Sequence, residues 1–496
     1  MKDQIKDQIK DQIKDKMGTT GLIFNEPLLW EKGSPGRKGL SLPRRDVNEA
    51  PLDEALVGDG PDFPDLSELD VVRHFTKLSQ WNFGVDSGMY PLGSCTMKYN
   101  PKTNERQASI PGFAGAHPLL PESLSQGALE LMVDLQGYLG EITGLPAVTL
   151  QPAAGSQGEL TGMLIFAAYH KNQGKPRTKV LIPDTAHGTN PASAALCGFK
   201  AVPVKSGPDG VLLPESVAEL MDEDTAGIMI TNPNTLGLFE DNIRQVASIV
   251  HAKGGLVYGD GANMNAVMGI VNIGDLGVDV LHLNLHKTFS TPHGGGGPGA
   301  GPVCVTPELE PFLPVPRVVK DGEVYRLDDN YPLSVGKVHA FFGNFGILLR
   351  AYSYILSMGN NLKEASQYAV LNANYIKERL KGVYHLPYDR PCMHECVFTD
   401  KLQQEHHVAT LDIAKRLMDH GFHPPTIYFP LVVSGAIMIE PTESESKETL
   451  DQFIDAMKQI AQEAVECPDC LHESPQFPKV RRLDETAAAR NPCLKG

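Results

Sequence analysis

The sequence NLHKTFSTPHGGGGPGAG, from Asn284 to Gly301, joins the end of an apolar run to a lysine and a series of glycines. Lys287 follows the run VDVLHLNL and is expected at the end of a buried strand, where burial disfavours its charged form. A neutral lysine amine is a nucleophile that forms Schiff bases with aldehydes. Glycines allow positive φ and a close approach of the backbone to a bulky ligand. This combination suggests pyridoxal phosphate (PLP), although a surface lysine before a flexible linker has the same local pattern.

The composition is that of an ordinary globular protein with an acidic balance. The chain has 496 residues, and 44 basic against 60 acidic side chains give a net charge of −16, which does not point to nucleic acid or an anionic membrane as a partner. No run reaches the roughly 18 consecutive apolar residues of a membrane span, and the N-terminus resembles neither a signal peptide nor a transit peptide. Eight cysteines over this length are not a disulfide framework, so a reducing cytoplasm is expected.

The N-terminal part lacks the periodicity of a folded domain. KDQI repeats over residues 2–13 place an apolar residue at every fourth position, which fits either a docking helix or a solvated extension. Residues 18–65 are rich in Gly, Pro and charge, and indicate an arm that is either wrapped around a partner subunit or disordered. From Asp65, the expected cap, the pattern becomes helical. The residues expected on one face of this helix are Leu66, Leu69, Val72 and Phe75.

From about Leu120 onward, strand and helix patterns alternate. Apolar runs such as KVLIPD, AGIMIT and GLVYGD are typical of parallel strands buried on both faces, and helices separate them. A long amphipathic helix is expected to end at Gly144. Ligands of such sheets bind at the carboxyl ends of the strands. The residues expected at those ends are His187, Asn232, Asp260 and Lys287.

The composition changes after the glycine-rich stretch, which predicts a second, smaller α+β domain. The expected organisation is an N-terminal extension and arm over residues 1–84, a large PLP-binding domain over 85–335, a small C-terminal domain over 336–465 and an irregular tail over 466–496.

PLP requires four protein groups, and each has a candidate here. Lys287 is the candidate for the Schiff base, and Asp260 is the candidate carboxylate that keeps the pyridine nitrogen protonated. His187, in DTAHGTNP, is the candidate for stacking on the ring and for proton transfer. A turn at the start of a buried helix offers backbone N–H groups for the phosphate. This turn consists of Gly155, Ser156 and Gln157. Taken singly, His187 and the turn also fit a loop histidine and an ordinary helix cap; their shared location favours a site.

Six motifs are highly specific: PLGSCTMKYNP, QPAAGSQGE, DTAHGTNPASA, ITNPNTLGLFE, DGANMNA and NLHKTFSTPHGGGGPG. On these motifs, which span roughly residues 85 to 445, the chain resembles glycine decarboxylase, the P-protein of the glycine cleavage system. The family occurs as one long chain or as two subunits, and this chain is similar to subunit 2, the half that carries the lysine. The KDQI repeats and the C-terminal tail are outside the resemblance.

The resemblance implies an α/β, fold-type I PLP enzyme. It further implies decarboxylation of glycine, transfer of the aminomethyl group to the lipoyl arm of H-protein, and subunit 1 as partner in an α2β2 heterotetramer. The implied catalytic residues are Lys287, His187 and His286, and the implied cofactor contacts are Lys287, Asp260, His187, Asn263, Gly155, Ser156 and Gln157. The substrate carboxylate has Arg350 and Lys98 as candidates, with a residue of the partner subunit as the alternative.

Cysteine chemistry offers a rival interpretation. Two alternatives to a glycine decarboxylase remain. The first is another fold-type I enzyme, such as an amino-acid decarboxylase or a cysteine desulfurase, and the second is a regulatory subunit without activity. A desulfurase needs a mobile reactive cysteine, whereas Cys95 lacks an adjacent histidine and is expected to be inert. In the tail, Cys467, Cys470 and His472 do not have a common zinc spacing, so unpaired thiols and no metal are expected.

Overall fold

The computed structural model describes residues 26–493, which separate into two compact units. The larger unit runs from Gly88 to Ser474, and the smaller unit combines the described residues up to Ser87 with those from Pro475 onward. The KDQI repeats lie outside the described residues. Among the helices of residues 26–493, none has the length and apolar character needed to cross a membrane.

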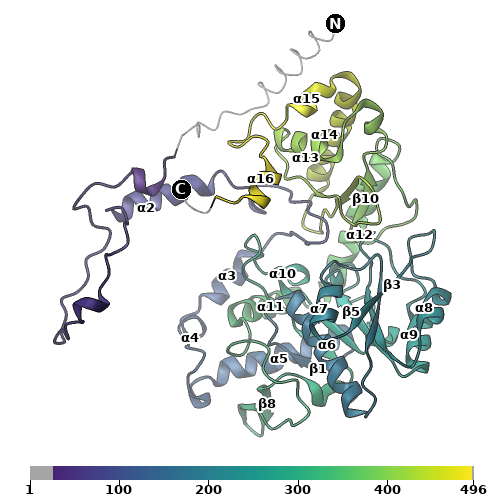
Figure 1. Ribbon diagram of the computed structural model, residues 1–496, viewed down its shortest axis with the longest axis horizontal. Helices are drawn as coiled ribbons and strands as arrows, with labels where there is room; N and C mark the ends of the chain where they lie inside the picture. Colours follow the sequence, from purple (N-terminus) through teal and green to yellow (C-terminus); the bar gives the residue numbers. More distant parts are fainter. Residues whose placement is uncertain (1–25, 494–496) are drawn as a thin grey trace. The chain divides into compact units, whose positions relative to one another are not determined.

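A seven-stranded sheet forms the centre of the larger unit (Figure 1). Its strand order is β1-β7-β6-β5-β4-β2-β3, and the pairs from β6 to β3 are all parallel, whereas β7 is antiparallel to both of its neighbours. The expected α/β fold with a mostly parallel sheet is therefore confirmed. The strands are β1 Ala147–Thr149, β2 Lys179–Pro183, β3 Lys200–Val204, β4 Thr225–Thr231, β5 Leu256–Gly261, β6 Val280–Leu283 and β7 Val303–Val305.

Helices cover both faces of this sheet, as continuous apolar strands require. In β2, Val180 and Ile182 belong to the core with α6 and α7, whereas Leu181 belongs to the core with α5, α8, α9 and α11. Successive strand side chains point to opposite faces, so one short strand supplies two cores. The helices are α5 Gln126–Thr143, α6 Gly155–Asn172, α7 Asn190–Leu196, α8 Pro214–Leu220, α9 Ile243–Ala252 and α11 Phe345–Met358. Helix α5 ends where expected, since Gly144 has a φ of 74° and donates its N–H to Gly140 O at 2.8 Å.

The C-terminal part of the larger unit has a small antiparallel sheet with the order β10-β12-β11 and helices packed on it. Its elements are α12 Leu362–Leu380, β10 Cys396–Thr399, α13 Thr410–Asp419, β11 Thr426–Ile427, β12 Ala436–Ile439, α14 Lys447–Glu466 and α15 Pro468–His472. The remaining α-helices and strands of the unit are α3 Lys102–Ala108, α4 Pro111–Ala114, α10 Leu285–Thr288 and the hairpin β8 Arg317–Asp321 with β9 Val324–Asp328.

The smaller unit contains α2 Glu68–Ser79 and α16 Glu485–Arg490. The expectation that Asp65 caps the first helix is wrong. Ser67 is the cap, because Ser67 Oγ accepts the Asp70 N–H while the Asp70 carboxylate accepts the Ser67 N–H, and this reciprocal box satisfies two free donors. Asp65 instead accepts the Gly36 N–H at 2.7 Å. Of the expected apolar face, Leu66 precedes the helix, whereas Leu69, Val72 and Phe75 are in it and are 54–56% exposed.

A buried ion pair in the C-terminal part predicts acid sensitivity. Arg416 Nε donates to Glu463 Oε2 at 2.7 Å, and both side chains are buried. Burial alone would raise the pKa of Glu463, but the His420 imidazole and the Arg416 guanidinium outweigh burial and lower it to about 2. A carboxyl with a lowered folded-state pKa stabilises the fold above its unfolded pKa, and this stabilisation is lost as the pH falls. We expect about 3 kcal/mol to be lost between pH ~4.5 and ~2.

Unfolding free energies measured from pH 6 downward check this expectation. The Glu463→Gln variant should lose its share of the pH dependence of the wild type in that window, about 3 kcal/mol, because its amide does not titrate. The exposed Glu466→Gln variant is the matched control on the same helix and should follow the wild type. Equal slopes for all three chains would contradict the assignment.

Candidate active site

Four neighbouring strands bring the predicted residues to one edge of the sheet. The strands β2, β4, β5 and β6 are consecutive in the sheet order, and their carboxyl ends carry the residues expected there. These are His187 after β2, Asn232 after β4, Asp260 within β5 and Lys287 after β6.

Lys287 lies in the short helix α10, one turn that begins directly after β6. Its side chain is almost fully buried, with 8% exposed. The charge of Lys287 influences the pKa of groups from many parts of the sequence, which shows how many titratable side chains surround it. These groups are Cys95, Glu159, His187, Asp260, His282, His286, His293, His394, Glu395 and Glu440.

Asp260 is held as a carboxylate by its neighbours. Its oxygens accept the Ala262 N–H at 3.0 Å and the Thr231 hydroxyl at 3.2 Å, and His282 Nε2 lies 3.4 Å away. Burial alone would raise the pKa of Asp260, but His282 and the Ala262 N–H lower it below its usual value. A buried carboxylate that stays charged is suited to hold a protonated pyridine nitrogen.

The start of helix α6 offers unpaired backbone donors. The first intrahelical bond in this turn runs from Gly158 N to Ala154 O, so the N–H groups of residues 155–157 have no partner within the helix. The glycine-rich stretch packs against this turn: a Cβ at Gly301 would lie 2.1 Å from Ala154 O. Ser156 is exposed, and the Gln157 side chain bonds to Ala153 N and Val338 O. The backbone, rather than the Gln157 amide, is therefore available to an anion.

The other predicted residues have specific partners. His187 Nδ1 lies 2.9 Å from Thr189 Oγ1, and Asn263 Nδ2 donates to Pro233 O at 2.9 Å. Burial and the charge of Lys287 lower the pKa of His286 to about 3. His286 is consequently a neutral and weak base, which makes His187 the better of the two candidates for proton transfer.

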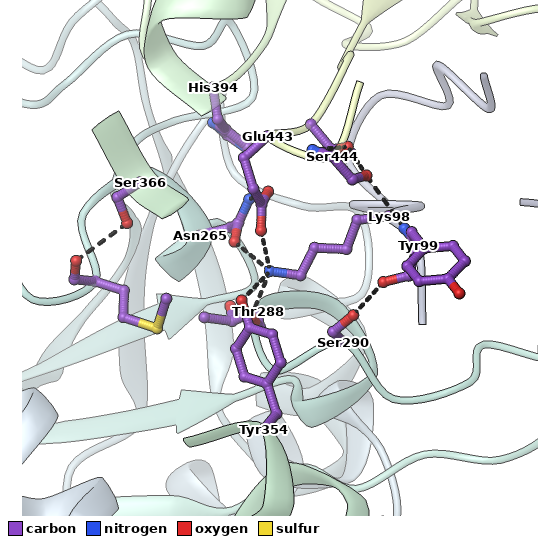
Figure 2. A network of polar contacts seen from close by, with 12 residues as sticks. Lys98, Tyr99, Asn265, Thr288, Ser290, Tyr354, Ser366, His394, Glu443 and Ser444 are labelled. Carbon is purple, nitrogen blue, oxygen red and sulfur yellow. Dashed lines mark hydrogen bonds and ion pairs between the residues drawn. The ribbon is translucent and has the colours of Figure 1, made fainter. Parts of the chain in front are cut away.

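Lys98 and Arg350 are both engaged with carboxylates of the chain. Figure 2 shows the buried Lys98 Nζ pointing into a ring of acceptors, which are Glu443 Oε1 at 2.6 Å, Thr288 O at 2.7 Å, Asn265 Oδ1 at 2.9 Å and Tyr354 Oη at 3.3 Å. Arg350 makes two bonds of 2.8 Å to the Glu105 carboxylate. Each side chain already has a negative partner, so neither is a free cation for the substrate carboxylate.

A second cluster near Lys287 has no counterpart among the predicted residues. Glu395 precedes β10 and Glu440 follows β12, and the register Cys396↔Ile439 places the two carboxyls opposite each other. His394 Nε2 lies 4.0 Å from Glu395 Oε2 and 3.9 Å from Glu440 Oε1, and all three side chains are buried. Burial raises the pKa of both glutamates, that of Glu440 to about 7. An acidic residue immediately after the apolar run GAIMI was the one local signal for this cluster.

The cysteines behave in two ways. Burial raises the pKa of the Cys95 thiol, which agrees with the expectation of an inert thiol. Cys467 and Cys470, by contrast, form a disulfide, so the expectation of unpaired thiols at these positions is wrong. His472 Nδ1 lies 3.5 Å from Asp412 Oδ2. The three residues thus have other partners and do not form a zinc site in this structure.

A buried lysine, a charged carboxylate on the neighbouring strand and a helix N-terminus are the groups that PLP requires, and their arrangement fits it. The family described as "Aminotransferase class-V" matches residues 159–311, the part of the chain that carries Asp260 and Lys287. Residues 365–476 match the family "Glycine dehydrogenase, C-terminal domain".

A relative that matches along nearly its whole length identifies the family of this chain. "Probable glycine dehydrogenase (decarboxylating) subunit 2" from Listeria innocua is 58% identical over 476 residues, which cover 95% of this chain and 98% of the relative. The chain therefore belongs to the family of glycine dehydrogenase (decarboxylating) subunit 2.

Solved structures agree on the fold. The crystal structure of an inhibitor-bound glycine decarboxylase (P-protein) of the glycine cleavage system is similar with a TM-score of 0.71 and 20% identity, covering 82% of this chain and 93% of that one. The cysteine desulfurase CsdA from Escherichia coli is similar with a TM-score of 0.58 and 13% identity, covering 76% and 95%. At these identities the likeness describes the fold alone.

Proposed function

We propose that this chain is the PLP-bearing subunit of a glycine decarboxylase. It takes glycine, releases CO2 and transfers the aminomethyl group to the lipoyl arm of an H-protein, together with a subunit 1 in an α2β2 assembly. The observation that carries the proposal is the position of buried Lys287 beside the charged Asp260, in a chain that matches subunit 2 over nearly its full length. The cytoplasmic location expected from the sequence stays a prediction.

Each group of the site has a separate proposed role in binding PLP. Lys287 would hold the cofactor covalently, Asp260 would pair with the pyridine nitrogen, and the turn at residues 155–157 would bind the phosphate through backbone N–H groups. When bound, PLP supplies an electron sink for the negative charge left by the loss of CO2. His187 would hold the ring of the cofactor and would carry a proton at the ring nitrogen that does not contact Thr189. The burial of Lys287 and Asp260 keeps water away from the reacting atoms.

The loop that carries Cys95 argues against the desulfurase alternative. Glu395 Oε2 accepts the Ser94 N–H at 2.8 Å and Glu440 Oε2 accepts the Thr96 N–H at 3.0 Å, so buried carboxyls hold the backbone on both sides of Cys95. A desulfurase needs a thiolate that can move to the substrate, whereas Cys95 is held in place and its pKa is raised. Decarboxylation of glycine does not need this thiol.

The proposed function is tested by exchange of labelled CO2 into glycine. We expect exchange when the chain, subunit 1 and lipoylated H-protein are combined, and weak or no exchange when any one is omitted. Release of sulfur from cysteine at a comparable rate, without exchange, would favour the desulfurase. Full exchange by the chain with H-protein alone would contradict the two-subunit assembly.

The apolar face of α2 is predicted to bind subunit 1. Obligate interfaces are large and apolar, and Leu69, Val72 and Phe75 expose such a surface. Replacing these three residues by serine should weaken association about 100-fold, as expected when several anchors are lost. Sedimentation of mixed subunits measures this. The matched control replaces exposed Glu68 and Arg73 of the same helix by serine and should associate normally. Equal weakening in both variants would mean that the helix, not its apolar face, matters.

A further inference from the structure

We propose that Glu159 and Thr189 form a hydrogen-bonded relay that determines which ring nitrogen of His187 carries the proton. At neutral pH the relay gives His187 a protonated Nε2, and ionisation of Glu159 moves the ring proton to Nδ1. The inference rests on the proposed function, because His187 acts there as the group that lies against the cofactor. Glu159 and Thr189 are positioning residues, since they reach the cofactor only through His187.

The geometry of the relay is a chain of three side chains. Thr189 Oγ1 lies 2.9 Å from His187 Nδ1 and 2.8 Å from Glu159 Oε1. The second oxygen of Glu159 accepts the Ser193 hydroxyl at 3.3 Å. Glu159 is on α6 and only 4% exposed, whereas His187 and Thr189 are on the loop that enters α7. Glu159 therefore affects His187 through a single hydroxyl.

Counting protons leaves two states of the relay. A carboxylate only accepts hydrogen bonds, so an ionised Glu159 accepts a hydrogen bond from the Thr189 hydroxyl. His187 Nδ1 must then donate its own hydrogen bond to the Thr189 oxygen. A protonated Glu159 donates to Thr189 instead, and the Thr189 hydroxyl donates to Nδ1. Nδ1 is then an acceptor, and the proton of the neutral ring is on Nε2. The protonation of Glu159 thus selects the tautomer of His187.

Two observations favour the second state at neutral pH. The Thr189 backbone N–H also points at His187 Nδ1, at 3.4 Å, which requires Nδ1 to accept. Burial and the charge of Asp260 raise the pKa of Glu159 to about 8, although Thr189, Ser193 and Lys287 act in the opposite direction. Asp260 has its pKa lowered, so of these two buried carboxyls Asp260 is charged and Glu159 keeps its proton.

The relay lets His187 change role without changing charge. Burial lowers the pKa of His187, so the ring is neutral in both states. Below the pKa of Glu159, Nε2–H is a donor for a group in the site. Above it, Nε2 is an acceptor. The other charged groups that act on His187 are Asp260 and Lys287, and neither contacts Nδ1.

The test is to read the tautomer directly by NMR of the full-length chain with 15N-labelled histidine rings, both cofactor-free and loaded with PLP. The His187→Gln variant identifies the His187 signals among those of 16 histidines. We expect protonated Nε2 at pH 7 and a change to protonated Nδ1 with a midpoint of about 8. In Glu159→Gln, whose amide does not ionise, the tautomer should be the same at all pH values. Thr189→Ser should keep the change and Thr189→Val should lose it.

Two results would overturn the relay. Protonated Nδ1 at pH 7 in the wild type would show that Glu159 is ionised. A midpoint near 8 that persists in Glu159→Gln and Thr189→Val would show that another group drives the change. The measurement needs neither glycine nor H-protein, so its failure is distinguishable from failure of the proposed function. Thr189→Ser, which keeps the hydroxyl, shows whether a loss in Thr189→Val comes from the bond or from disturbed folding.

Discussion

Replacing Lys287 with alanine is expected to abolish covalent capture of PLP and to lower glycine–CO2 exchange by at least about 1,000-fold, the order of loss when an enzyme loses a group that acts covalently. The reason is chemical: Lys287 supplies the amine, and buried Lys98 cannot replace it because its Nζ is bonded to Glu443 and Thr288. The fold should survive, because alanine is accepted at a helical position and Asp260 keeps its hydrogen bonds from Ala262 and Thr231.

Borohydride reduction followed by peptide mapping makes this measurable. The wild type should be yellow and should carry the reduced cofactor on the peptide containing Lys287, whereas the variant should carry none. The exposed Lys200→Ala variant is the control and should be labelled like the wild type. Label on a peptide containing Lys98, or unchanged label in Lys287→Ala, would contradict the assignment.

Replacing Lys98 with methionine should destabilise the larger unit by about 3 kcal/mol, because the partly buried Glu443 carboxylate loses its cation. Thr288 O and Asn265 Oδ1 also lose their donor. The double variant Lys98→Met, Glu443→Gln should recover part of this loss, since the stranded charge is then removed.

Thermal unfolding of Lys98→Met, Glu443→Gln and the double variant gives the coupling free energy between the two side chains. The control is Lys447→Met, which removes an exposed ion pair with Asp451 and should cost less than about 1 kcal/mol. A Lys98→Met chain as stable as Lys447→Met would show that burial of Lys98 is not coupled to Glu443.

Local patterns in the sequence were sufficient for the sheet and for the residues at its edge. Lys287, Asp260 and His187 follow apolar runs that could only be buried strands, and the rule for parallel sheets places such residues together. The end of α5 at Gly144 was also predictable from a local pattern, because a helix commonly ends at a glycine, which tolerates positive φ.

The remaining contacts depend on segments that are distant along the chain. Glu443 and Lys98 are separated by 345 positions, and Glu395 and Glu440 meet only through the register of a small sheet. Competition between similar residues explains the error at α2. Asp65 and Ser67 are both good caps, and both have an acidic residue three positions on, Glu68 and Asp70, but only Asp70 returns the hydrogen bond. Pairwise geometry of this kind is not encoded in any single stretch.

The bonds of Lys98 have a consequence for synthesis on the ribosome. Lys98 donates a hydrogen bond to the carbonyl of Thr288, next to Lys287, and its charge is paired with Glu443. Glu443 is translated more than 150 residues after Lys287. Domains fold as they emerge, so a nascent chain exposes the strand ends before Glu443 exists to complete the contact. The lysine turn becomes fully held only when the C-terminal sheet has formed. We therefore expect the chain to bind PLP only after the C-terminal sheet has formed.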